Sequence, residues 1–257
     1  MATPRGERAL PAGVLIGLPM LGALSLVLAL RGVFPPGGID ARIFDPAAVA
    51  GVCWAGQLLY VGHSLDWERT VSRLWPQVFS LANALTVVRG ALYAVVAGFV
   101  VVPPNTDLVW VPALAYGTGA LLDKLDGTVA RTFGRETALG ERLDMAFDTF
   151  GFVAAPLVAV LWGLLPAWYL SLSAARYVYR GGLAWRRRRG RPVFDPPDSD
   201  LGKYLAGVQM AFITAALSPA VPTGLVRTLA PFVLAPSLAV FARDFLVATG
   251  RISGREN

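Results

Sequence analysis

The sequence predicts an all-α, polytopic membrane helix bundle, and three observations support this prediction. Hydrophobic residues make up 55% of the 257 residues, whereas a soluble domain contains about 45–50%. Long apolar runs with few charges recur, for example at 12–30, 91–102 and 151–165, and a helix of roughly 20 apolar residues spans a bilayer. Prolines and glycines separate these runs, as expected for the turns between membrane helices.

The apolar runs predict about eight transmembrane helices. They are expected over residues 12–33, 46–64, 80–102, 110–133, 141–164, 166–185, 201–218 and 224–247. The segment 65–79 mixes charges with two tryptophans, which is typical of an amphipathic helix at the headgroup level. We therefore expect residues 1–64 to form a two-helix N-terminal membrane extension. Residues 65–257 should form a membrane domain with a six-helix catalytic core.

The charge distribution indicates the orientation in the membrane. The chain has 23 basic and 17 acidic residues, a net charge of +6, which in a soluble protein would suggest nucleic acid. Here the arginines lie between apolar runs, so we expect them to set topology and to contact anionic headgroups, with no nucleic-acid partner. Most of them fall on alternate loops, including a predicted polar loop at 186–200 that begins with four arginines. This side is predicted to be cytoplasmic, with both termini, in a multi-pass protein of the cell membrane.

Four acidic residues are expected near the membrane, where unpaired carboxylates are costly and indicate function. Asp123 and Asp126 share one face of a predicted helix, and Asp144 and Asp148 share a face of the next helix. The short connection lets the two faces meet as an antiparallel pair. Converging carboxylates need a counter-charge, and oxygen ligands suit hard divalent cations such as Mg²⁺. The single cysteine, Cys53, excludes an intrachain disulfide and a thiolate metal site.

The spacing of these aspartates belongs to a longer pattern. The chain reads Asp123-x2-Asp126-Gly127-x2-Ala130-Arg131-x8-Gly140-x3-Asp144-x3-Asp148. This pattern resembles, at every fixed position, the signature of the CDP-alcohol phosphotransferase (CDP-alcohol phosphatidyltransferase) family. The predicted plan from residue 65 onward also resembles that family, while the first two helices lie outside the resemblance.

The resemblance implies an activity and a role for each residue. The enzymes transfer a substituted phosphate group from a CDP-linked donor, such as the lipid CDP-diacylglycerol, to a small alcohol acceptor and release CMP, in phospholipid biosynthesis. Asp123, Asp126, Asp144 and Asp148 would hold two divalent ions, Mg²⁺ or Mn²⁺, and Asp148 would also be the general base. The resemblance further implies a homodimer. The charge distribution puts these aspartates toward the cytoplasmic ends of their predicted helices, so we expect the active site to face the cytoplasm. Contacts with the CDP moiety are implied for six residues: Gly127, Ala130, Arg131, Asn83, Thr86 and Arg89.

The acceptor is predicted from the basic residues that follow. Arg176 and Arg180 are one turn apart on a predicted helix, and Arg191 and Lys203 flank the next loop. Together they could bind an anionic acceptor such as glycerol 3-phosphate or an inositol phosphate, although topology or headgroup contacts explain Arg180 and Arg191 equally well. A deeply placed arginine is costly in a membrane, which favours a functional role for Arg176.

Two other functions use similar carboxylates. An intramembrane prenyltransferase also binds pyrophosphate through metal and aspartates, but it lacks a place for Gly127, Ala130 and Arg131. A non-enzymatic cation transporter would carry its acids near the bilayer midplane, whereas these four fall toward the predicted cytoplasmic ends of their helices.

Overall fold

The computed structural model describes residues 45–64, 81–133, 138–194 and 200–252, and this part of the chain is helical, with no strand. The predicted first membrane helix at 12–33 and the interfacial helix at 65–79 lie outside the described residues. The helices are α2 (Pro46–Ser64), α4 (Leu81–Gly98), α5 (Val111–Phe133), α6 (Ala138–Leu161), α7 (Ser171–Arg188), α8 (Asp200–Leu217) and α9 (Thr223–Ala248), with short 3-10 turns η1 (Phe99–Val101) and η2 (Ala167–Leu170).

Local sequence signals account for several helix ends. Pro46 opens α2, where its missing N–H costs nothing, and the Asp45 carboxylate accepts a hydrogen bond from the Ala47 N–H at 2.9 Å. At the end of α6, Gly163 adopts φ +69° and the Leu164 N–H donates to the Ala159 carbonyl at 2.8 Å. This left-handed glycine turn ends the helix before Pro166.

The prediction of a loop beginning at Arg186 was wrong. Arg186, Arg187 and Arg188 form the last turn of α7. Arginine is a good helix former, and positive charge near a helix C-terminus is stabilised by the helix dipole. The arginine run therefore extends the helix by most of a turn and turns away only at Gly190, which has φ +64°.

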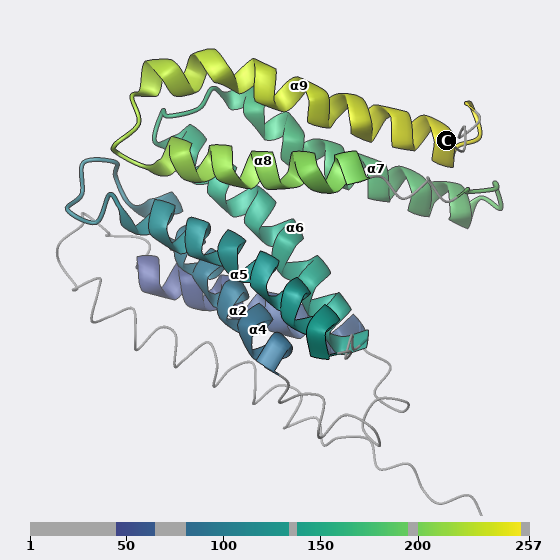
Figure 1. Cartoon of the computed structure of the whole chain (residues 1–257), viewed down its shortest axis with the longest axis horizontal. Helices are drawn as coiled ribbons and strands as arrows, with labels where there is room; N and C mark the ends of the chain where they lie inside the picture. Colours follow the sequence, from purple (N-terminus) through teal and green to yellow (C-terminus); the bar gives the residue numbers. More distant parts are fainter. Residues whose placement is uncertain (1–44, 65–80, 134–137, 195–199, 253–257) are drawn as a thin grey trace, which may run out of the picture.

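The helices form two groups that meet along α5 and α6. Figure 1 shows α7, α8 and α9 on one side of the bundle and α2, α4 and α5 on the other, and α9 packs against both α7 and α8. Helix α4 packs extensively against α2, α5 and α6, whereas α5 and α6 make few direct contacts with each other. The expected antiparallel pair of α5 and α6 is therefore joined mainly through α4.

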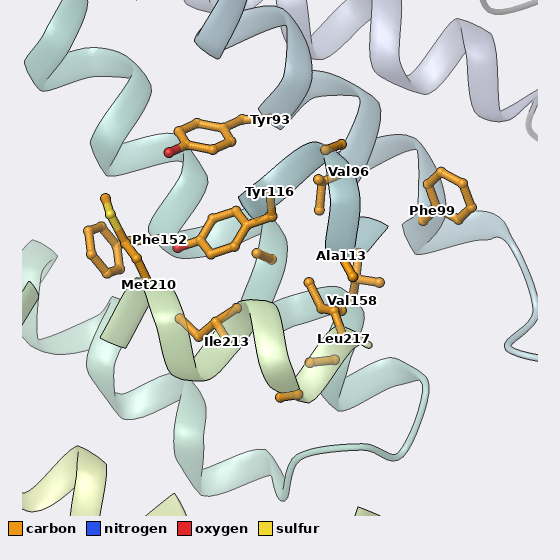
Figure 2. Close-up of a cluster of buried hydrophobic side chains, with 14 of the residues drawn as sticks. Tyr93, Val96, Phe99, Ala113, Tyr116, Phe152, Val158, Met210, Ile213 and Leu217 are labelled. Atoms are coloured by element: carbon orange, nitrogen blue, oxygen red, sulfur yellow. The ribbon is translucent and has the colours of Figure 1, made fainter. Parts of the chain in front are cut away.

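One hydrophobic core runs through this packing. Figure 2 shows buried side chains from α4, α5, α6 and α8 in contact, among them Tyr93, Tyr116 and Ile213. Helix α2 adds Ala47, Ala50 and Trp54 to the same cluster. The segment before residue 65 thus contributes to the core that supports the rest of the described helices.

Each described α-helix exposes large apolar side chains, as expected for contact with lipid. Val52, Leu121 and Phe232 are 73%, 65% and 72% exposed. Among the described residues, Leu143–Leu161 within α6 and Thr223–Ala248 are long and apolar enough to cross a membrane, and Leu85–Val101 and Leu201–Leu217 are apolar but shorter. The predicted count of eight spans remains a prediction.

Candidate active site

Three of the four predicted aspartates come together from α5 and α6. Asp123 lies on α5, and Asp144 and Asp148 lie one turn apart on α6. One carboxylate oxygen from each lies within 4.8 Å of the others. Asp126 lies one turn beyond Asp123 on α5, and its side chain is not among those described. The spacing in the sequence predicted that these faces could meet, and the three described carboxylates do come together.

Arg89 lies at the centre of the three carboxylates. Its side chain is 0% exposed and donates hydrogen bonds to Asp123 and Asp144, and its Nη2 lies 3.6 Å from Oδ1 of Asp148. The resemblance implied a nucleotide contact for Arg89 and gave no contact with the aspartates. A signal was present, because an arginine within an apolar helix requires anionic partners, and four aspartates follow it in the sequence.

Close packing of α4 against α6 places Arg89 beside Asp148. A Cβ atom at Gly90 would lie 2.8 Å from the ring of Phe147, a separation that real side chains do not tolerate. Gly90 and Phe147 are the chain neighbours of Arg89 and Asp148. The absence of a side chain at Gly90 therefore lets the two helices approach each other at the level of the site.

The donor set fits a hard divalent cation. One guanidinium, that of Arg89, makes ion pairs with all three described carboxylates, so its single charge does not balance theirs. Oδ1 of Asp148 is buried and accepts no hydrogen bond from the residues that the structure describes. Oxygen-only ligands favour Mg²⁺ or Mn²⁺ over zinc.

A cavity lies between α6, α7, α8 and α9, and its lining does not include Asp123, Asp144 or Asp148. Its volume is about 380 Å³, and its lining includes Phe152, Arg176, Lys203 and Asp244. Phe152 is one turn beyond Asp148 on α6, and the Arg176 guanidinium lies over its ring, 5.3 Å from the centroid. Two of the four predicted acceptor residues, Arg176 and Lys203, therefore line one cavity, whose nearest lining residue along α6 is one turn from Asp148.

A buried polar network forms another wall of this cavity. The Tyr169 hydroxyl donates a hydrogen bond to the Gln209 side-chain oxygen. The Gln209 side-chain nitrogen donates to Oγ of Ser237 at 2.9 Å and to the Val233 carbonyl at 2.8 Å. Gln209 and Ser237 also line the cavity. The network links η2, α8 and α9 with its hydrogen bonds satisfied inside an apolar bundle, which makes it stabilising.

Arg191, another residue predicted to bind the acceptor, lies outside this cavity. It is exposed beyond the end of α7, and its guanidinium lies 5.7 Å from the ring centroid of Trp185. It is not among the residues that line the cavity. Arg180 belongs to α7, but its side chain is outside the described set.

The residues implied to contact CDP are described unevenly. Thr86 is 4% exposed and lies one turn before Arg89 on α4. Asn83 belongs to α4, and Gly127, Ala130 and Arg131 belong to α5 beyond the carboxylates. The side-chain positions of these four residues lie outside the described part of the structure, so their nucleotide contacts remain a prediction.

Comparison with known proteins gives a family and a small group of relatives. The model of the CDP-alcohol phosphatidyltransferase family matches residues 79–250. One protein from Mycobacterium bovis and two from strains of Mycobacterium tuberculosis, each named "Putative cardiolipin synthase", are 31% identical to the chain over 114 residues. The aligned stretch covers 43% of this chain and 53% of each relative, so the chain spans about half the length of these curated relatives. No solved structure matches the chain significantly.

Proposed function

The chain belongs to the CDP-alcohol phosphatidyltransferase family, and we propose that it is a membrane enzyme that transfers a phosphatidyl group from a CDP-linked lipid donor to an alcohol, with release of CMP. The observation that carries this proposal is the convergence of Asp123, Asp144 and Asp148 within 4.8 Å. These residues belong to the signature and lie within the matched region.

The metal would be held by the carboxylates of Asp123, Asp144 and Asp148, with Asp126 completing the set. A divalent cation bound there supplies positive charge to the phosphate oxygens of the donor and so lowers the barrier to nucleophilic attack. Arg89 adds a fixed guanidinium to the same site, and its planar fork also suits phosphate oxygens. Gly127, Ala130, Arg131, Asn83 and Thr86 would bind the cytidine nucleotide.

Asp148 would act as the general base. Oδ1 of Asp148 accepts no hydrogen bond from the described residues, so this oxygen can accept one from an acceptor hydroxyl. The hydroxyl oxygen forms a bond to the donor phosphorus distal to cytidine, and its proton passes to Asp148. The bond between that phosphorus and the bridging oxygen breaks, and CMP leaves with the electron pair.

The acceptor would occupy the cavity that Phe152 lines, one turn beyond Asp148 on α6. Arg176 and Lys203 line it together with one acidic residue, Asp244, so its basic residues outnumber its acidic ones. An anionic polyol such as glycerol 3-phosphate or an inositol phosphate matches this lining. The name of the mycobacterial relatives favours a second candidate, a phospholipid alcohol whose phosphatidylation gives cardiolipin.

We propose a multi-pass arrangement in the cell membrane with both termini and the aspartates on the cytoplasmic side, and a homodimeric assembly. Residues 1–64 would be an N-terminal extension of the catalytic domain at 65–257. This division is compatible with the family match, which begins at residue 79.

CMP release by the purified full chain tests the proposed function. The protein would be assayed in detergent with CDP-diacylglycerol, Mg²⁺ or Mn²⁺, and one acceptor at a time: glycerol 3-phosphate, inositol phosphate, inositol, serine or phosphatidylglycerol. We expect metal-dependent CMP release with one acceptor, lost in Asp148→Asn. Failure with every acceptor and with soluble CDP-alcohols, in a folded protein, would reject the transferase. Metal uptake into proteoliposomes would then support the transporter, and release of pyrophosphate from a prenyl diphosphate the prenyltransferase.

A further inference from the structure

Tyr93 is a buried residue of α4 close to the aspartate site. It is one turn beyond Arg89 on α4, its side chain is 0% exposed, and its ring lies 5.3 Å from that of Tyr116. Figure 2 shows Tyr93 at the edge of the buried cluster, with its ring beside that of Tyr116. Its hydroxyl has no hydrogen-bond partner among the described residues. The position of the ring therefore depends on shape rather than on a polar contact.

The two edges of the Tyr93 ring face different helices. A Cβ atom at Gly151 of α6 would lie 2.7 Å from Cδ2 and Cε2 of the ring. A Cβ at Gly119 of α5 would lie closer still to Cε1, on the opposite edge. Both distances are too short for a real contact, so the ring fills the space between two glycine positions.

These glycines lie one turn from the carboxylates. Gly119 precedes Asp123 by four residues on α5, and Gly151 follows Asp148 by three residues on α6. Helices α5 and α6 make few direct contacts with each other. The width of the Tyr93 ring between its two edges therefore contributes to how far apart the two helices lie at the level of the site.

We propose that Tyr93 is a positioning residue whose ring sets the spacing between Asp123 on α5 and Asp144 and Asp148 on α6. Divalent cations such as Mg²⁺ tolerate little variation in ligand distance, so this spacing determines whether the carboxylates can share one ion. The inference rests on the proposed metal site. It assigns to Tyr93 no contact with metal or substrate.

The test measures metal binding without substrate. Mn²⁺ would be titrated into the purified full chain, with free Mn²⁺ followed by electron paramagnetic resonance. Adding a methyl group at either contact should push α5 and α6 apart, so we expect Gly119→Ala and Gly151→Ala to weaken Mn²⁺ binding by about tenfold or more. Tyr93→Phe keeps the ring and should bind Mn²⁺ like the wild type.

Gly182→Ala is the matched control. Its added Cβ would lie 2.8 Å from the ring of Phe245, so it creates a similar clash between α7 and α9, helices that carry none of the four aspartates. It should lower thermal stability as Gly151→Ala does, with Mn²⁺ affinity unchanged. In the double variant Gly151→Ala/Tyr93→Leu, the smaller side chain should relieve the clash and restore binding to within about threefold.

Several outcomes would overturn the proposal. The Mn²⁺ affinity could stay unchanged in both glycine variants, or fall equally in Gly182→Ala. Tyr93→Leu could fail to restore the Mn²⁺ affinity of Gly151→Ala. Tyr93→Phe could lose Mn²⁺ binding, which would make the hydroxyl the important group. If the glycine variants do not fold, Tyr93→Leu alone should weaken Mn²⁺ binding. A wild-type protein that binds no Mn²⁺ also rejects the proposal, whereas Mn²⁺ binding without CMP release rejects only the transferase.

Discussion

Arg89 and Asp123 are 34 residues apart in the chain, and the guanidinium of one donates a hydrogen bond to the carboxylate of the other. The same guanidinium contacts Asp144 and Asp148 on α6. One side chain from α4 thus links the two helices that carry the signature. Arg89 is therefore as much a part of the site as the aspartates that the spacing identified.

Replacing Arg89 should destabilise the metal-free protein. Arg89→Gln removes a fully buried cation from three carboxylates, and breaking a buried ion pair costs roughly 3 kcal/mol or more. We expect a clear fall in the thermal unfolding temperature in EDTA, partly reversed by Mg²⁺ because the metal supplies the missing charge. Arg89→Lys keeps the charge but loses the planar guanidinium, so its unfolding temperature in EDTA should lie between those of Arg89→Gln and the wild type. Equal stability of Arg89→Gln and wild type in EDTA would contradict this account.

Asp144 and Asp148 should respond differently to added metal. If Asp144 is only a ligand, Asp144→Asn should raise the Mn²⁺ concentration needed for half-maximal CMP release by about tenfold or more, and saturating Mn²⁺ should restore most activity. Asp148→Asn also removes the proposed base, so its kcat should remain about 10²–10⁴-fold low at any Mn²⁺ concentration. Recovery of Asp148→Asn at high Mn²⁺ would assign the base to another residue.

The basic residues of the cavity should affect the acceptor and not the donor. A charge-assisted hydrogen bond is worth about 1.5–3 kcal/mol, so Arg176→Gln and Lys203→Gln should each raise KM for an anionic acceptor by about tenfold or more. KM for CDP-diacylglycerol should stay within about twofold. Arg187→Gln, an exposed arginine at the end of α7, is the matched control. If KM for the acceptor does not change in either cavity variant, the acceptor binds elsewhere.

The proposed topology can be tested with cysteine labelling. Cys53 is the only cysteine in the chain, so Cys53→Ser gives a cysteine-free background. Asn105→Cys, Ala220→Cys and Arg251→Cys then place single thiols at exposed positions. In intact cells an impermeant maleimide should label Asn105→Cys and Ala220→Cys. Arg251→Cys should be labelled only after the cells are lysed. Labelling of Arg251→Cys in intact cells would reverse the proposed orientation.

The sequence predicted the helices well because membrane helices are long, apolar and bounded by proline and glycine. The expected ranges for α2 and α9 agree with the structure to within a residue or so, and the spacing of Asp144 and Asp148 correctly placed both on one face. The sequence alone did not predict how α4 packs against α5 and α6. That packing depends on Gly90 facing Phe147 and on the Tyr93 ring facing Gly119 and Gly151, which are contacts between residues far apart in the chain.

Only some of the residues predicted to bind the acceptor lie together in the structure, again because helix packing could not be predicted from the sequence. Arg176 and Lys203 are on different helices, and the packing of α7 and α8 places both in the cavity. Arg191 is near them in sequence, but the extra turn of α7 carries it to the exposed ring of Trp185. Charge pattern alone does not reveal how far a helix continues before its basic residues leave it.

The hydrogen bonds of Gln209 also constrain how α8 can move. Its amide contacts Tyr169, Ser237 and the Val233 carbonyl at once, and only one rotation of α8 about its own axis satisfies all three. In an apolar bundle there is little water to replace a broken contact, so turning or sliding this helix would be costly. Lys203 is on the same rigid helix, less than two turns away. The point on α8 from which the Lys203 side chain starts is therefore fixed relative to the cavity by an uncharged residue deeper in the bundle.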